Sequence, residues 1–137
     1  MSNVIEGEVS IKSMEKVIQY FSDYKNLISC IPGVKEISEN NFKAQVKISF
    51  LTVEINGSVK KHKISENNID TLIVVEGPGI VANIDTLLTL TQNNIKWKSN
   101  YEISGPLANS LRKYIESEAE ELSRKIIECS ISKINKS

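Results

Sequence analysis

Apolar and polar residues alternate along most of the chain, which is typical of strands with one buried and one solvated face. The alternating segments lie at 5–11, 41–50, 53–60, 69–76, 80–90 and 95–103. Short polar turns separate most neighbouring segments, and the clearest is Gly77-Pro78-Gly79. Strands joined by such short turns must pair in an antiparallel manner. The pattern therefore predicts an antiparallel sheet whose apolar face another element must cover.

The pentapeptide Ile-Ser-Glu-Asn-Asn occurs twice, at 37–41 and at 64–68. The residues that follow the two copies differ, and both copies lie beside alternating segments. We interpret them as one kind of polar turn used twice, not as an internal repeat.

Two short helices are expected between the first two alternating segments. Ser13 can cap a helix that ends near Phe21, and Asp23 can cap a second one. The second helix must stop before Ile31-Pro32-Gly33, because the residue before a proline disfavours helical backbone angles.

A larger helix is predicted to start at Gly105-Pro106 and to run to about Ile134, a length of roughly 40 Å. One apolar stripe follows it at helical spacing. The stripe consists of Leu107, Ala108, Leu111, Ile115, Ala119, Leu122, Ile126 and Cys129.

These elements predict an α+β helix-grip fold, in which a curved antiparallel sheet of about seven strands wraps around the long C-terminal helix. The two short helices follow the first strand, and residues 1–137 form a single domain. Several inward positions of the sheet are small, so they would not fill the space beneath the helix. An internal apolar cavity is therefore expected, and such cavities are common ligand sites.

The composition excludes several function classes. The 17 basic and 17 acidic side chains balance, which argues against a nucleic-acid binder. The single histidine, His62, excludes a multi-histidine metal site, and no glycine-rich phosphate loop is present. Cys30 and Cys129 stand alone without a secretory signal, so we expect two reduced cytoplasmic thiols. No stretch of about 18 apolar residues could span a membrane.

Four segments carry a resemblance to a known family. They are Leu27-Ile28-Ser29-Cys30-Ile31-Pro32-Gly33-Val34-Lys35-Glu36-Ile37, Phe42-Lys43-Ala44-Gln45-Val46-Lys47-Ile48, Ile55-Asn56-Gly57-Ser58-Val59 and Ile103-Ser104-Gly105-Pro106-Leu107-Ala108. These segments resemble the CoxG family, which takes its name from the G subunit of carbon monoxide dehydrogenase and belongs to the START/Bet v 1-like (SRPBCC) superfamily. The similarity runs from about Val4 to Ile131, and the matches occur in the family's order.

The resemblance implies a cytoplasmic accessory protein that holds a quinone-like or lipid-like molecule and serves a molybdenum-containing dehydrogenase, in some members at the inner face of the membrane. Two features depart from the family. Phe50-Leu51-Thr52-Val53 replaces a turn that usually carries glycine or proline. Many members also have a C-terminal extension that engages the membrane, whereas this sequence ends at Ser137, so peripheral membrane contact stays open.

The residues expected to line the cavity come from the inward faces of the strands and the helix. They are Val46, Ile48, Ile73, Ile84, Leu88, Trp97, Tyr101, Leu111, Ile115, Glu118 and Leu122. Trp97 and Tyr101 form either an aromatic wall for a ring-bearing ligand or ordinary core packing. Glu118 falls within the apolar stripe, where it would anchor a polar head or act as a general base; otherwise it reaches solvent at the stripe's edge.

Several other residues have both a functional and a structural interpretation. We expect His62, which lies among three lysines, to be a solvated residue at a strand end, and Cys30 to be a small buried residue rather than a reactive thiol. The Phe50–Val53 turn is either a cavity gate or membrane-touching tip, or a loop contact. The apolar residues Ile127, Ile131 and Ile134 form either a homodimer or partner surface, or helix-end packing on the sheet.

Three functions follow. The first is a non-catalytic carrier of a hydrophobic small molecule, with no cofactor other than a bound quinone or lipid. The second is a cyclase or hydrolase that uses Glu118, although the interior offers few other polar groups than Ser99, Thr71 and Thr86. The third is a structural adaptor with a packed interior.

Overall fold

A computed structural model describes residues 2–48 and 50–136 of the chain. Within these residues, seven strands form one antiparallel sheet in the order β1-β7-β6-β5-β4-β3-β2. The strands are β1 (Ser2–Ser10), β2 (Val34–Ser38), β3 (Asn41–Ile48), β4 (Leu51–Ser65), β5 (Asn68–Gly77), β6 (Ile80–Leu90) and β7 (Asn94–Ser104). Each strand from β2 to β6 pairs with the next one along the chain, and β1 completes the sheet beside β7.

The alternation of the sequence located every strand except β2. Most side chains of β2 are exposed, so this short edge strand shows no period of two. The repeated pentapeptide forms the β2–β3 and β4–β5 turns, and its glutamate has a positive φ in both, 55° at Glu39 and 40° at Glu66. The interpretation as one turn used twice is confirmed.

The two short helices are α1 (Met14–Phe21) and α2 (Tyr24–Ile28). Both predicted caps are present. The Ser13 hydroxyl accepts a hydrogen bond from the backbone N–H of Lys16 at 3.3 Å, and the Asp23 carboxylate accepts one from Lys25 at 3.0 Å. The caps satisfy N–H groups that have no partner within the helix.

The long helix differs from its prediction, because it is divided into α3 (Pro106–Ser110) and α4 (Arg112–Lys136). Leu111 lies between them with φ −116° and ψ 29°, outside the helical region. Gly105 has φ 112° and ψ 164°, a conformation essentially restricted to glycine, and it directs the chain from β7 into α3. The backbone N–H of Leu107 then donates to the carbonyl of Gly79 at 2.8 Å, which fixes α3 on the β5–β6 turn.

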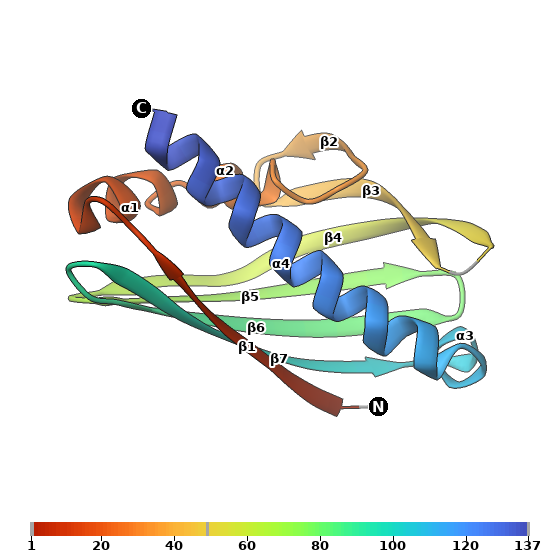
Figure 1. Ribbon diagram of the computed structural model, residues 1–137. Helices are drawn as coiled ribbons and strands as arrows, with labels where there is room; N and C mark the ends of the chain where they lie inside the picture. Colours follow the sequence, from red (N-terminus) through yellow and green to blue (C-terminus); the bar gives the residue numbers. More distant parts are fainter. Residues whose placement is uncertain (1, 49, 137) are drawn as a thin grey trace.

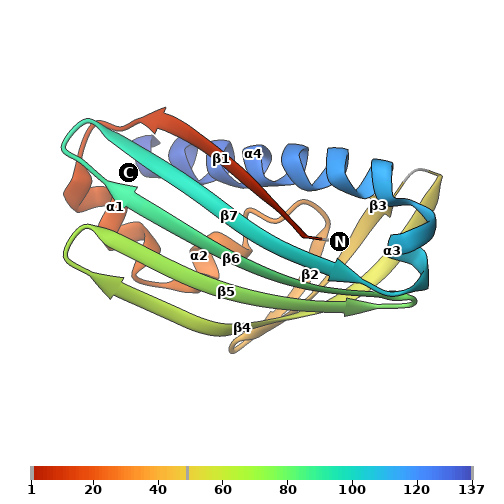
Figure 2. The same cartoon turned by 90° about the horizontal axis from the view of Figure 1, so that it is seen from below.

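Helix α4 crosses one face of the curved sheet diagonally (Figure 1). The view from below shows α3 at one end of the sheet and α1 and α2 at the other (Figure 2). This arrangement of a curved antiparallel sheet, a long C-terminal helix and two early short helices confirms the predicted helix-grip fold.

The C-terminal half of α4 is fastened to the residues that directly follow α2. Cys30 and Cys129 form a disulfide with their Cα atoms 5.7 Å apart, and the Lys133 ammonium donates to the Ser29 hydroxyl at 3.1 Å. The expectation of two reduced thiols is therefore wrong in this structure. The two cysteines are 99 positions apart, and their spacing in the sequence does not predict that the fold brings them together.

The end of α4 also packs on α1. Ile127 and Ile134 are buried, and Ile131 packs against the same cluster, so these residues form helix-end packing and offer no exposed dimer or partner surface. The predicted stripe missed this face of the helix, on which Ser130 is also fully buried.

The core consists of two clusters at the two ends of the sheet. One gathers the inner faces of β3, β4, β6 and β7 with α3, Ile115 and, from α2 and the residues after it, Ile28 and Ile31. The other gathers α1, the opposite ends of β6 and β7, and the end of α4. The middle of α4 spans the interval between them.

Replacing Gly105 with alanine should destabilise the fold. A Cβ at this position would collide with the Gly79 carbonyl, and the backbone conformation costs about 1–3 kcal/mol for a residue other than glycine. We expect Gly105→Ala to lower the urea midpoint, whereas Ser104→Ala, at the exposed neighbouring position, should leave it unchanged. Equal midpoints for the two variants would contradict this account of the β7–α3 junction.

Reduction of the disulfide should also destabilise the protein. A crosslink that closes a loop of this length restricts the unfolded chain by about 4–5 kcal/mol in the chain-entropy model. Dithiothreitol should therefore lower the Tm of the oxidised protein and leave the Tm of Cys30→Ser/Cys129→Ser unchanged. Two titratable thiols in the protein purified without reductant would show that the bond is not formed.

Candidate ligand cavity

An apolar cavity of about 140 Å³ lies beneath the middle of α4, between the two core clusters. The residues predicted for its wall that do line it are Val46, Ile73, Ile84, Leu88, Trp97, Tyr101 and Leu122. Side chains from β3 to β7 form the floor, and the inward face of α4 forms the roof.

The cavity exists because side chains are short where the sheet and helix stand apart. Along β6 the inward residues Ala82 and Leu88 are buried, whereas Ile84 and Thr86 between them are only partly covered. On the roof, Ala119 and Ser123 face the cavity and are too small to reach the sheet. Small residues on both sides thus leave space that a neighbouring bulky side chain does not fill.

Three predicted wall residues lie elsewhere. Leu111 and Ile115 pack in the first core cluster and do not reach the cavity. Glu118 is exposed on α4, so the expectation that it faces the cavity is wrong. The side chain of Ile48, also predicted for the wall, lies outside the described part of the chain.

The two aromatic residues of β7 form a flat part of the wall. The Trp97 indole lies over Gly7 of the neighbouring strand, where a Cβ would come within 2.6 Å of the ring. Tyr101 lies further along the same strand, and its buried hydroxyl has no hydrogen-bond partner among the described residues. Burial raises the pKa of the Tyr101 phenol, an effect partly offset by the nearby Asn3 side chain.

A row of hydroxyl groups crosses the floor. Thr71 of β5 pairs in register with Thr86 of β6, which pairs with Ser99 of β7, so the three side chains lie side by side on the concave face. The Thr86 and Ser99 hydroxyls are 2.8 Å apart. Thr71 and Ser99 are each only 3% exposed, and all three line the cavity.

His62 extends this row onto β4, so the expectation of a solvated histidine is wrong. Its Nε2 lies 2.6 Å from the Phe21 carbonyl and its Nδ1 2.8 Å from the Thr71 hydroxyl, while its ring meets Tyr24 edge to face. A carbonyl can only accept, so Nε2 carries the proton, and in the neutral imidazole Nδ1 accepts from Thr71. His62 therefore ties the end of α1 and the start of α2 to the sheet.

The α1–α2 segment closes one end of the cavity, with Phe21, Leu27 and Ile31 on its wall. Cys30 is buried beside this end and is bonded to Cys129, so it is not a free thiol at the cavity mouth. Nearby, the Tyr20 hydroxyl donates to the carbonyl of Asn26 at 3.0 Å, and burial raises the pKa of its phenol.

The Phe50–Val53 turn, one candidate for a cavity gate, does not line the cavity. Phe50 is 81% exposed at the β3–β4 turn, whereas Val53 is buried. The Gly77–Gly79 turn is held against Leu107 at the start of α3.

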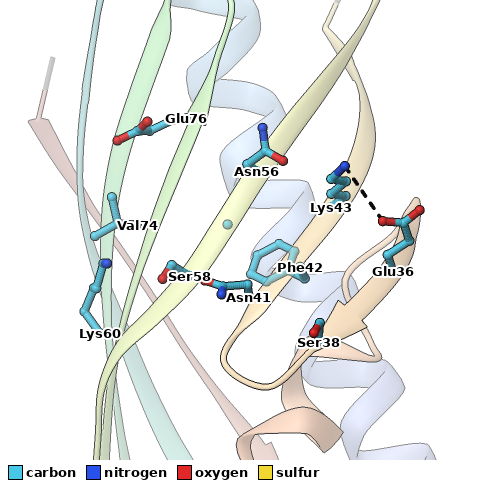
Figure 3. Close-up of a pocket in the computed structure, with 11 residues that line it drawn as sticks. Glu36, Ser38, Asn41, Phe42, Lys43, Asn56, Ser58, Lys60, Val74 and Glu76 are labelled. Carbon is cyan, nitrogen blue, oxygen red and sulfur yellow. Dashed lines mark ion pairs between the residues drawn. The ribbon is translucent and has the colours of Figure 1, made fainter.

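A second hollow of about 400 Å³ lies on the convex face of the sheet, over β2, β3, β4 and β5 (Figure 3). Polar and charged side chains surround it, including the exposed ion pair between Lys43 and Glu36 at 3.9 Å. The Phe42 ring occupies the space that a side chain at Gly57 would need, and it lies between this hollow and the interior cavity. Because the hollow is shallow and open to solvent, the interior cavity is the better candidate site.

Three charged groups meet elsewhere on the convex face. The Lys61 ammonium lies 3.0 Å from Asp70 and 3.4 Å from Asp85. A hydrogen bond between the two carboxyl groups lowers the pKa of Asp70 and raises that of Asp85. These residues are distant from the cavity floor because they point from the opposite face of the sheet.

The described residues contain no group of three acidic, cysteine or histidine side chains that could hold a metal ion. No helix within residues 2–48 and 50–136 has the length and apolar character needed to cross a membrane. The cavity lining itself offers apolar contacts and a few hydroxyl groups.

The size of the cavity limits what it can hold. An engineered cavity of about 150 Å³ binds benzene, whereas sites for drug-sized ligands usually measure about 300–1,000 Å³. At about 140 Å³ the cavity admits one ring or a short apolar chain without rearrangement.

The family model for CoxG, the G subunit of carbon monoxide dehydrogenase, matches residues 7–135. The chain belongs to the CoxG family. No curated protein sequence matches it. The resemblance inferred from the four sequence segments is thus confirmed.

Solved structures share the fold of this CoxG-family chain at low sequence identity. A conserved protein from Geobacillus kaustophilus is 20% identical, with 98% of this chain and 97% of that chain covered and a TM-score of 0.73. For a START superfamily protein from Mycobacterium smegmatis the identity is 15%, the coverage 96% and 98%, and the TM-score 0.58. Norcoclaurine synthase from Thalictrum flavum is 15% identical, with 98% of this chain and 86% of that chain covered and a TM-score of 0.60. These structures establish the START/Bet v 1-like fold.

The cavity predicts opposite responses at two inward serines of α4. Ser123→Leu should keep or raise the Tm, because the cavity accepts the larger side chain. Ser130→Leu should lower the free energy of unfolding by about 1–3 kcal/mol, because Ser130 is fully buried in packed surroundings. Equal losses in thermal unfolding would contradict the presence of free space beside Ser123.

Proposed function

We propose that this CoxG-family protein binds a single apolar, ring-bearing molecule of the quinone type, or a lipid-like chain, in the cavity beneath α4. The observation that carries the proposal is a partly enclosed apolar space between two packed core clusters, with Trp97 on its wall. A ring fits the volume, and apolar contacts on the floor and roof would stabilise it. A longer tail would need to leave the cavity or displace neighbouring side chains.

The role we propose is non-catalytic. An enzyme would require several polar groups that converge on the bound molecule. Glu118, the one acid considered for general-base chemistry, is exposed, and the polar groups on the floor are hydroxyls engaged with one another or with His62. Norcoclaurine synthase shares the fold, but fold alone does not transfer an activity.

The partner we propose is a molybdenum-containing dehydrogenase of the carbon monoxide dehydrogenase type. Support for it comes from the family to which the chain belongs. The protein would bring the apolar molecule to that enzyme or hold it nearby.

We propose a cytoplasmic location with peripheral contact at the inner face of the membrane. Phe50 supports this contact, because a large apolar side chain that is 81% exposed at a hairpin tip is suited to insert among lipids. The Cys30–Cys129 disulfide is an argument against a cytoplasmic location, since the cytosol keeps most thiols reduced.

The binding test uses Trp97, the only tryptophan of the chain, as the reporter. Duroquinone is a suitable ligand because it has one ring, and its four methyl groups block conjugate addition to lysines. We expect saturable quenching of Trp97 fluorescence by duroquinone. Ser123→Leu, which fills the cavity, should weaken binding by about tenfold or more, or about 1.4 kcal/mol.

Ser117→Leu is the matched control, because Ser117 is exposed on the same helix. It should bind duroquinone as the unmodified protein does. Equal affinity in both serine variants would place the ligand outside the cavity. Absence of saturable binding by quinones and fatty acids would favour the structural adaptor, and turnover of the bound molecule would favour an enzyme.

A further inference from the structure

The hydroxyl row on the cavity floor carries an inference about which molecules the site selects. On either side of the row the floor is apolar except for the phenol hydroxyl of Tyr101. Ile69, Leu88 and Trp97 pair across the strands on one side, and Ile73, Ile84 and Tyr101 do so on the other. The row is therefore a narrow polar band within an apolar surface.

The protons of this band can be counted. The Thr71 hydroxyl donates its only proton to Nδ1 of neutral His62, and the Nε2–H of His62 donates to the Phe21 carbonyl. Thr86 and Ser99 hold two protons but share one mutual hydrogen bond. Whichever of the two donates, one hydroxyl proton of the pair remains, and the described residues offer it no second partner.

When Ser99 donates to Thr86, the remaining proton belongs to Thr86, whose side chain lines the cavity and is only partly covered, whereas Ser99 is 3% exposed. A buried donor without an acceptor is costly, so a ligand that supplies an acceptor oxygen is favoured over a hydrocarbon of the same shape.

We infer that the Thr86–Ser99 hydroxyl pair selects a ring-bearing ligand with a carbonyl-type oxygen, by donating one hydrogen bond to that oxygen inside the apolar cavity. The inference rests on the proposed function and specifies the ligand class of the same site. It also sets the orientation of the ligand, with the oxygen on the floor and the apolar edge against Ala119 and Ser123 of the roof.

The test compares duroquinone with durene, the hydrocarbon that has the same ring and methyl groups but no oxygen. Binding of duroquinone is read from Trp97 quenching, and binding of durene from its competition with duroquinone. The unmodified protein should bind duroquinone about tenfold more tightly than durene. Thr86→Val combined with Ser99→Ala should remove that preference by weakening duroquinone about tenfold and leaving durene within about twofold.

Two further variants serve as controls. Thr86→Ser keeps the hydroxyl and should keep the preference, and it provides the comparison with Thr86→Val alone if the double variant does not fold. Thr89→Val removes a hydroxyl from the opposite face of the same strand and should have no effect.

The outcomes separate this inference from the proposed function. If both ligands bind with equal affinity, or the double variant keeps its preference for duroquinone, the inference is overturned while a cavity that binds rings stands. If neither ligand binds the unmodified protein, the proposed function fails and this inference fails with it.

Discussion

The structure depends on one geometric constraint: a straight helix cannot follow a curved sheet. Helix α4 is fixed at one end through α3, which is bound to the β5–β6 turn, and at the other by the Cys30–Cys129 disulfide and the packing of Ile127 and Ile134 on α1. Each fixed end forms a packed cluster. Between them the helix spans the concave face, and small residues in its middle leave the distance to the sheet unfilled. The cavity thus follows from the way in which the helix is supported.

The same supports determine the polarity of the cavity. His62 joins the end of α1 to the sheet and accepts a hydrogen bond from the Thr71 hydroxyl. Because of this bond, the Thr71 proton is not available to a ligand on the cavity floor. The remaining hydroxyls, Thr86 and Ser99, lie in the same cross-strand row. Pairing in register, with all side chains of a row on one face, places them together. Selectivity in such a site arises from few polar groups, because each is isolated within apolar surroundings.

The sequence predicted most of the fold, because alternation reports directly which face of a strand is buried, and most of the sheet-borne wall followed from it. It failed for β2, whose side chains are exposed, and for the helix roof. Two serines, Ser123 and Ser130, occupy inward positions and hide the true centre of the buried face. The apolar stripe therefore pointed toward Glu118, which is exposed. The disulfide and the contacts of His62 depend on long-range proximity, which local patterns do not encode.

Native mass spectrometry of the gently purified, oxidised protein would decide whether the cavity binds a ligand, because it detects a molecule that the protein has selected from the cell. We expect one co-purifying apolar small molecule with at least one carbonyl-type oxygen, released on denaturation and found in an organic extract. A mass equal to that of the chain alone, unchanged after incubation with quinones and fatty acids, would contradict a binding function for the cavity.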